Sequence, residues 1–282
     1  MPLMNITKEI GDMAQGPKNN NLLKRIISAL VMLPIAIFII LSGGVPFFIL
    51  ISLLTILVLS EWNGICENKP ISLLFGVQAL CGVLLMYQIY WGSPYIEISI
   101  ASSLVSIIAV SYIVKAKVRW ALMGFLYAVI PSISFFLIHQ QSGGLVVLWM
   151  MIVIWSMDTG AYFAGKNIGG PKMAPKISPN KTWSGLIGGT LTAMALGWVY
   201  VFFVKDNNIP LFDNVTILLF LSGFFAILSQ IGDLAESAVK RHFSIKDSGS
   251  LIPGHGGIMD RIDGVLFVAP ALVLTEYLMF AR

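Results

Sequence analysis

The sequence predicts an all-α integral membrane protein, a bundle of about nine transmembrane helices with a cytoplasmic N-terminus. Of the 282 residues, 57% are hydrophobic and only 11% are charged, and the mean hydropathy is +0.84. An ordinary soluble domain carries about a quarter charged residues. Apolar runs near the ~20 residues that cross a bilayer recur along the chain, separated by short polar or Gly- and Pro-rich breaks. The third observation is that basic residues fall almost entirely on one side of these runs.

The predicted spans follow one another with short connections. They are 26–41, 45–59, 71–90, 94–114, 120–139, 144–164, 185–204, 215–231 and 265–280. We expect residues 1–25 to form a cytoplasmic N-terminal tail, 26–140 to form a scaffold of N-terminal transmembrane helices, and 141–282 to form a C-terminal transmembrane catalytic region. No small-residue cleavage site follows the first run, so it is not expected to be a cleaved signal peptide.

The basic residues predict the orientation. With a cytoplasmic N-terminus, only Lys205 and Arg282 of the 18 Lys and Arg residues fall outside. The positive-inside rule therefore favours a multi-pass protein of the cell inner (plasma) membrane whose polar loops, and any active site on them, face the cytoplasm. The formal net charge of +4 is a by-product of this asymmetry, so no nucleic-acid partner is expected. Cys66 and Cys81 have no metal-ligand spacing and are interpreted as apolar thiols.

Polar residues concentrate in the C-terminal half, and the first cluster is "MDTGAYFAGKNIGG". Asp158 lies within an apolar run, where an ionised carboxylate is costly unless it is paired or faces water, which makes it a candidate functional residue. Tyr162 and Lys166 follow at intervals of one helical turn, on the same face. The alternative is a helix-end aspartate paired with loop lysines.

The second cluster is "GGPKMAPKISPNKTWSG", in which three lysines alternate with three prolines. This composition favours a shaped loop over a long helix. Ser178, Asn180 and Thr182 add hydroxyl and amide groups beside Lys181. Such a loop could bind lipid headgroups or a nucleotide triphosphate by neutralising phosphate, although cytoplasmic loops collect lysines anyway.

The third cluster runs from the eighth span to the ninth and ends in "PGHGGIMDRIDG". On a continuous helix Asp233, Glu236 and Lys240 share one face. Asp260 and Asp263 lie one turn apart if the last helix starts near Met259. Facing carboxylates would form an all-oxygen site that suits Mg²⁺, with basic groups for phosphate. This arrangement indicates phosphoryl or nucleotidyl transfer; the alternative is a salt-bridge network that ties two helices together.

The polar positions of 237–263 resemble the motif of the phosphatidate cytidylyltransferase (CDP-diacylglycerol synthase) family. The matching residues are Ser237, Lys240, Arg241, Lys246, Asp247, Gly249, His255, Gly256, Gly257, Asp260, Arg261 and Asp263. The segments 158–166 and 178–185 resemble the same family. One departure is Ser184, where the family often has an acidic residue, and this leaves the role of that position open.

The resemblance implies that CTP and phosphatidic acid from the inner leaflet react to CDP-diacylglycerol and pyrophosphate with Mg²⁺, in a protein that forms a homodimer. Asp233 and Asp260 are then the principal metal ligands, with Asp263 and Glu236 as further ligands or supporting residues. The carboxylate count permits a second metal ion. The expected phosphate and nucleotide contacts are Lys181, Lys240, Arg241, Arg261, His255, Ser178, Asn180 and Thr182, and Asp158 contacts the nucleotide or the metal.

Other membrane activities are alternatives. A CTP-using lipid kinase, or another membrane phosphotransferase, would share the charged site but release CDP. A CDP-alcohol phosphotransferase would need a different pattern of aspartates and glycines, which the sequence lacks. A cation transporter with Asp158, Asp233 and Asp260 along its path is disfavoured, because the outer halves of the spans carry no matching polar residues.

Overall fold

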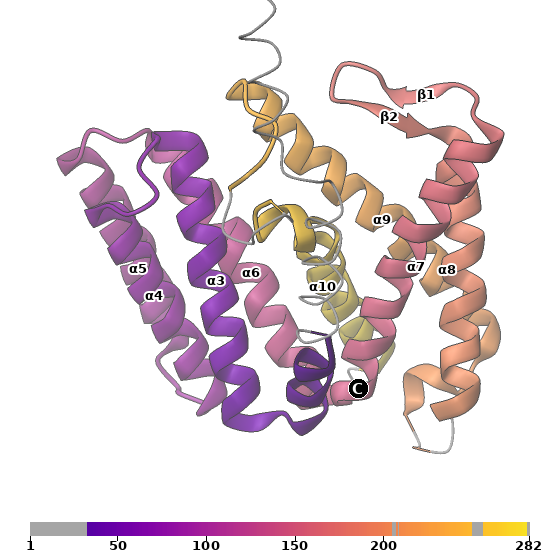
Figure 1. Ribbon diagram of the computed structural model, residues 1–282. Helices are drawn as coiled ribbons and strands as arrows, with labels where there is room; N and C mark the ends of the chain where they lie inside the picture. The colour runs from indigo at the N-terminus through magenta and orange to yellow at the C-terminus, as the bar shows by residue number, and fades with distance from the viewer. Residues whose placement is uncertain (1–32, 205–206, 208, 250–255, 281–282) are drawn as a thin grey trace, which may run out of the picture.

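The structure is a computed structural model that describes residues 33–204, 207, 209–249 and 256–280. Within these ranges eight helices are long and apolar enough to cross a membrane, and a shorter apolar helix covers Leu33–Ser42. These helices confirm the predicted all-α integral membrane protein (Figure 1). The first expected span, 26–41, lies partly outside the described residues, and its described part falls in the short helix.

The elements follow the predicted order. They are α3 (Gly44–Glu67), α4 (Leu73–Tyr90), α5 (Ile96–Ile113), α6 (Val118–Ser142), α7 (Gly144–Ile168), β1 (Lys172–Ala174), β2 (Ser178–Thr182), α8 (Trp183–Val204), the 3-10 turn η2 (Pro210–Phe212), α9 (Val215–His242) and α10 (Met259–Phe280). Several helices extend past the apolar runs at the end that carries the basic residues. Helix α9 continues to His242, and α10 begins at Met259 as predicted.

Helix α10 lies between two groups of helices (Figure 1). It contacts α3 and α6 on one side and α7 and α9 on the other. The largest apolar core centres on α7, where Trp149, Val153 and Met157 are fully buried against residues such as Phe225 of α9 and Leu272 of α10. The three elements that carry most polar side chains, α7, α9 and α10, are therefore held together by one core.

Small residues bring the site helices unusually close together. A Cβ at Gly189 of α8 would lie 2.6 Å from the carbonyl oxygen of Met157 on α7. A Cβ at Gly232 of α9 would lie 2.7 Å from the carbonyl oxygen of Asp263 on α10. Helices in membranes associate through such small residues because the backbones can touch. The contact between Gly232 and Asp263 means that Asp233 and Asp263 lie where α9 and α10 pack directly against each other.

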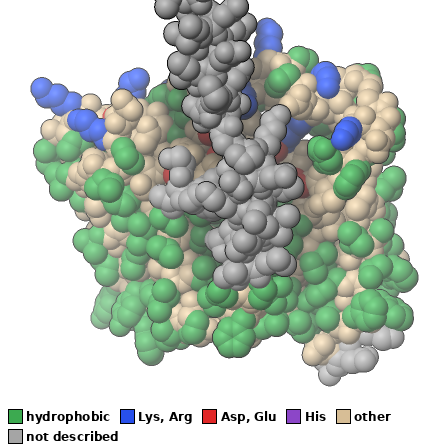
Figure 2. All heavy atoms as spheres, in the orientation of Figure 1, with side chains coloured by type: hydrophobic (Ala, Val, Ile, Leu, Met, Phe, Trp, Pro, Cys, Tyr) green, Lys and Arg blue, Asp and Glu red, His purple; other side chains and the backbone are tan. Residues whose placement is uncertain are grey.

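The described Lys and Arg residues lie at one end of the bundle. They occupy the α3–α4 and α5–α6 connections, the hairpin β1–β2 and the ends of α7 and α9 next to it, and the start of α10. Figure 2 shows Lys and Arg side chains along the upper edge of the molecule and a hydrophobic surface below them. The structure thus has the one-sided charge distribution that the sequence indicated.

Candidate active site

A polar cavity of about 310 Å³ lies where α7, α9 and the hairpin β1–β2 meet the start of α8. Its lining includes five of the predicted site residues, which are Asp158, Asn180, Lys181, Thr182 and Asp233. Its other lining residues are Ala161, Tyr162, Gly185, Leu186 and Gln230. Segments that are distant in the sequence therefore form one cavity at the basic end of the bundle.

Two carboxylates in this cavity have specific partners. Asp233 forms an ion pair with Lys181, with 2.5 Å between Nζ and Oδ2, and it accepts a hydrogen bond of 3.3 Å from the Ser237 hydroxyl. Asp158 accepts a hydrogen bond of 3.1 Å from the side-chain amide of Gln230. The predicted functional residue Asp158 thus lies beside α9, and Lys181 links the hairpin to the same helix.

The hairpin β1–β2 forms from the proline-rich loop. Lys172 pairs with Thr182 and Ala174 with Ser178 in antiparallel register. Thr182 is 4% exposed, and its hydroxyl accepts hydrogen bonds of 3.1 Å from the backbone N–H of Gly185 and from the Ser184 hydroxyl. It therefore caps the start of α8 in addition to lining the cavity. Ser178 is part of β2 but is not among the lining residues.

Ser184 also bonds to the loop that precedes the hairpin, because its hydroxyl donates to the carbonyl oxygen of Gly169. A serine at this position therefore joins the end of α7 to the start of α8. The structure gives Ser184 a local role in holding the hairpin in place.

Lys240 connects α9 with α10. The side chain is 8% exposed and forms ion pairs with Asp260 and with Glu236, whose Oε1 lies 3.4 Å from Nζ. Glu236 is 1% exposed, and a buried charge of this kind is tolerable only when it is paired. The predicted shared face of Asp233, Glu236 and Lys240 is present on the continuous helix α9.

Asp260, at the start of α10, accepts hydrogen bonds from residues of the connection between α9 and α10. Its Oδ1 accepts from Lys240, while Oδ2 accepts hydrogen bonds from the backbone N–H groups of Ser248, at 3.0 Å, and Gly257, at 3.2 Å. Both carboxylate oxygens are therefore engaged with protein donors here, and the metal role of Asp260 stays a prediction.

Glu61, a buried residue of α3, is not among the site residues predicted from the sequence. Its Oε1 accepts from the N–H of Ile258 at 2.8 Å, and its Oε2 accepts from the N–H of Met259 at 2.8 Å and the Ser248 hydroxyl at 2.9 Å. The first N–H groups of a helix have no partner within the helix, and a carboxylate is a favourable acceptor for them. A carboxylate within an apolar stretch is itself a functional signal, which would have identified Glu61.

The remaining predicted residues have different surroundings. Asp263 accepts a hydrogen bond of 2.8 Å from the N–H of Gly264 and lies near enough to Asp233 and Asp158 for their charges to interact. Arg241 donates to the carbonyl oxygens of Ile177 and Ile245 and so ties the hairpin to the end of α9. Arg261 is exposed at the start of α10. His255 lies outside the described residues.

The donor chemistry fits a magnesium ion that takes part of its shell from a substrate. Among the described residues no three His, Cys, Asp or Glu side chains converge on one point, so these residues do not form an all-protein cage. Mg²⁺ usually binds one or two carboxylates and fills its remaining positions with water and phosphate oxygens. Asp158 and Asp233 line the same cavity and are the carboxylates there that fit this pattern.

The chain is similar to known proteins of one family. Residues 23–279 match the model of the cytidylyltransferase family. The chain belongs to this family. It is 36% identical to a phosphatidate cytidylyltransferase of Staphylococcus aureus (strain COL) over 258 residues, 89% of this chain and 95% of the relative. It is 37% identical to the phosphatidate cytidylyltransferase of Brucella suis biovar 1 (strain 1330) over 261 residues, 90% of this chain and 93% of the relative. The family match covers α3 to α10, and therefore every element of the site.

Proposed function

We propose that this cytidylyltransferase-family chain is the membrane enzyme that makes CDP-diacylglycerol from CTP and phosphatidic acid. The observation that carries the proposal is the polar cavity, in which Lys181 of the hairpin and Asp158 and Asp233 of two membrane helices meet at the basic end of the bundle. Relatives that align over most of the chain carry the name of this activity.

The reaction joins two anions. An oxygen of the lipid phosphomonoester attacks the α-phosphorus of CTP, and the bond from that phosphorus to the oxygen bridging the β-phosphorus breaks, so that pyrophosphate leaves with the electron pair. A phosphomonoester with a second pKa near ~6 is largely dianionic at neutral pH. A strong general base is therefore unnecessary, and the protein acts mainly by positioning and electrostatic stabilisation.

The cavity residues would divide this task between them. Lys181 would neutralise the triphosphate, and Asn180 and Tyr162, which line the same space, would form hydrogen bonds to the nucleotide. A magnesium ion bound at Asp233 and Asp158 would offset phosphate charge. Arg261 is exposed at the start of α10, where a guanidinium would suit the phosphate of phosphatidic acid.

Orientation and assembly belong to the same proposal. The end that holds the described Lys and Arg residues would face the cytoplasm, where CTP is available, in agreement with the positive-inside rule. Phosphatidic acid would enter from the adjoining leaflet of the inner membrane. The homodimer rests on the family resemblance alone.

The test is a reaction of the purified full-length protein in detergent with labelled CTP, phosphatidic acid and Mg²⁺. We expect CDP-diacylglycerol and equimolar pyrophosphate. Release of CDP with a phosphorylated lipid would identify a CTP-using kinase, and failure to form either product under conditions in which CTP binds would refute the proposal.

A pair of carboxylate variants localises the activity. Asp233→Asn removes the charge that faces Lys181 and is expected to reduce turnover at least about a hundredfold, as is typical for electrostatic groups at transferring phosphates. Asp213→Asn is the matched control, because Asp213 is exposed at the opposite end of the bundle. Equal effects of the two substitutions would remove Asp233 from the site.

A further inference from the structure

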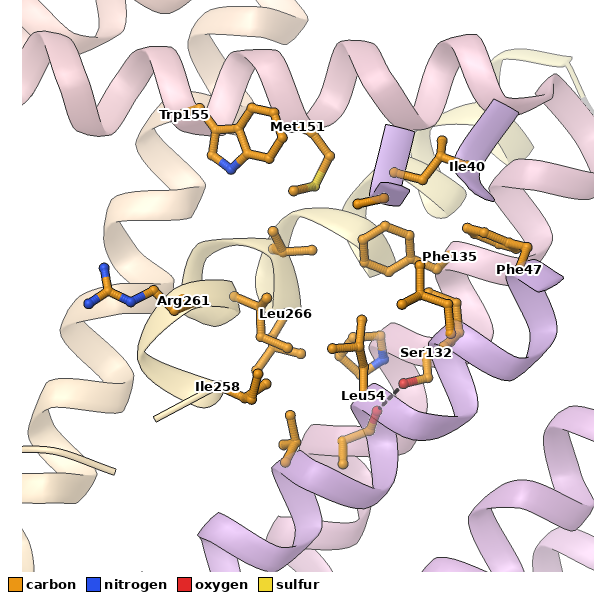
Figure 3. Close-up of a pocket in the computed structure, with 18 of the residues that line it drawn as sticks. Ile40, Phe47, Leu54, Ser132, Phe135, Met151, Trp155, Ile258, Arg261 and Leu266 are labelled. Atoms are coloured by element: carbon orange, nitrogen blue, oxygen red, sulfur yellow. Dashed lines mark hydrogen bonds between the residues drawn. The ribbon is translucent and has the colours of Figure 1, made fainter. Parts of the chain in front are cut away.

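A second cavity, of about 440 Å³, lies between α3, α6, α7, α10 and the helix Leu33–Ser42 (Figure 3). Almost every side chain that lines it is hydrocarbon or aromatic. Ser132 is the hydroxyl in the lining, and it is already engaged, accepting from Thr55 at 2.7 Å and donating to the carbonyl oxygen of Ala128 at 2.8 Å. Apart from Arg261, the described walls therefore offer a ligand mainly dispersion contacts.

The cavity runs along the bundle for about the depth of one leaflet. Phe47 and Val58 of α3 both line it, and at 1.5 Å per residue their α-carbons are about 16 Å apart along the helix axis. Half of the hydrocarbon core of a bilayer is about 15 Å. Ile40 and Phe47, at 7% and 1% exposure, line the end of the cavity away from Arg261. A lining of this length suits a single extended hydrocarbon chain.

One end of the cavity lies toward the candidate active site. Met151 and Trp155 of α7 line the apolar cavity, and Asp158, one turn further along the same helix, lines the polar cavity. Arg261, the charged residue among the described residues of the apolar lining, is next in sequence to Asp260. In Figure 3 its guanidinium points away from the apolar side chains, near Ile258 and at the opposite end from Phe47.

We infer that this cavity holds one acyl chain of phosphatidic acid and sets the preferred chain length, with Arg261 at its mouth beside the lipid phosphate. The inference rests on the proposed function and adds the part of the protein that selects the lipid. An apolar lining about as long as one leaflet is deep, with Arg261 at one end among the described residues, is the complement of a phosphomonoester that carries a hydrocarbon tail.

The test measures kcat/KM for phosphatidic acids of different chain length. Ala36 is half-buried in the lining on the helix Leu33–Ser42, and Ala36→Phe would shorten the cavity. We expect kcat/KM for dihexadecanoyl phosphatidate to fall relative to dihexanoyl phosphatidate by roughly tenfold for every two methylenes excluded. KM for CTP is expected to stay at the parent value, because Ala36 does not line the polar cavity.

Two further variants keep the inference falsifiable. Leu50→Ala enlarges the lining near Phe47 and should shift the preference toward longer chains, which provides a result even if Ala36→Phe does not fold. Ala101→Phe, on an exposed position of α5 outside the lining, is the matched control and should keep the parent preference. The inference would be overturned if the parent enzyme is active on both lipids and the ratio of kcat/KM for the two chain lengths is unchanged in both Leu50→Ala and Ala36→Phe. That result would leave the proposed function intact. A parent that is inactive on every phosphatidic acid would overturn the proposed function, and the inference with it.

Discussion

At the scale of single residues, two carboxylates share the hydrogen-bond donors of the loop that joins α9 to α10. Asp260 accepts from the N–H groups of Ser248 and Gly257. Glu61 accepts from the hydroxyl of Ser248 and from the two N–H groups at the start of α10. Ser248 therefore contacts both carboxylates. The position of Ser248 and of the start of α10 thus depends on Glu61, a residue from the N-terminal half of the chain.

Glu61→Gln is expected to slow turnover without weakening the binding of CTP. The amide replaces one acceptor oxygen with a donor that faces N–H or O–H groups, and a hydrogen bond to a charged acceptor contributes about 1.5–3 kcal/mol. We expect kcat to fall at least roughly tenfold because the start of α10 shifts. KM for CTP should change little, since Glu61 does not line the polar cavity. Steady-state kinetics with both substrates measures this split.

Glu67→Gln is the control on the same helix. Glu67 accepts one long hydrogen bond, 3.3 Å, from the backbone N–H of Lys117 at the exposed end of α3, and its substitution should leave kcat unchanged. A matching loss in both variants, or a loss of CTP affinity in Glu61→Gln, would contradict the positioning role of Glu61.

Residue roles were predictable where partners are close in sequence or belong to a motif. The spacing of Glu236 and Lys240 predicted that they share one face of a helix, and on α9 the structure shows them in an ion pair. The interaction of Glu61 with Met259 spans 198 positions, and no local pattern encodes it. The division into an N-terminal scaffold and a C-terminal catalytic region stays a prediction, and Glu61 is a described side chain that links the two parts.

At the scale of helices, the sequence predicted the order and the type of the elements well. It predicted the residues at which the helices begin and end less well. Apolar length decides that a helix crosses the membrane, but the helix continues as long as its backbone and side chains find partners. Helix α9 therefore extends past the apolar run to His242 and carries Asp233, Glu236 and Lys240 on one continuous helix. Close helix packing was not predicted, because it depends on which glycines face one another.

Gly232→Ala tests the packing of α9 on α10. An alanine normally stabilises a helix interior by about 1 kcal/mol relative to glycine, but a Cβ here would lie 2.7 Å from the carbonyl oxygen of Asp263 and 3.1 Å from the ring of Phe267. The helices must separate, so we expect a lower melting temperature in detergent and a loss of turnover.

Gly76→Ala in α4 is the control for helix propensity, because no atom lies within 4 Å of its Cβ position. Its melting temperature should equal or exceed that of the parent. An unchanged or higher melting temperature for Gly232→Ala would show that α9 and α10 tolerate a wider separation than the structure has.

At the scale of the whole molecule, one end of the bundle combines charge and catalysis. The described basic residues lie at the end of the bundle that holds the polar cavity, and the apolar cavity runs from Arg261 at the start of α10 to Phe47 near the start of α3. Composition and charge asymmetry predicted this polarity without any knowledge of contacts. The separation into a polar and an apolar cavity was not predictable, since it arises from side chains of seven helices and the hairpin that meet only in the folded bundle.

The orientation is testable with single cysteines in a background that carries Cys66→Ser and Cys81→Ser. Lys176→Cys lies in the turn of the hairpin, at one end of the bundle, and Tyr95→Cys lies in the α4–α5 connection, at the other end. Each parent residue is exposed. We expect a membrane-impermeant maleimide to label Tyr95→Cys in intact cells whose outer permeability barrier has been removed, and to label Lys176→Cys only after the membrane is disrupted. The reverse pattern would place the polar cavity outside, away from cytosolic CTP, and would contradict both the positive-inside interpretation and the proposed entry of the nucleotide.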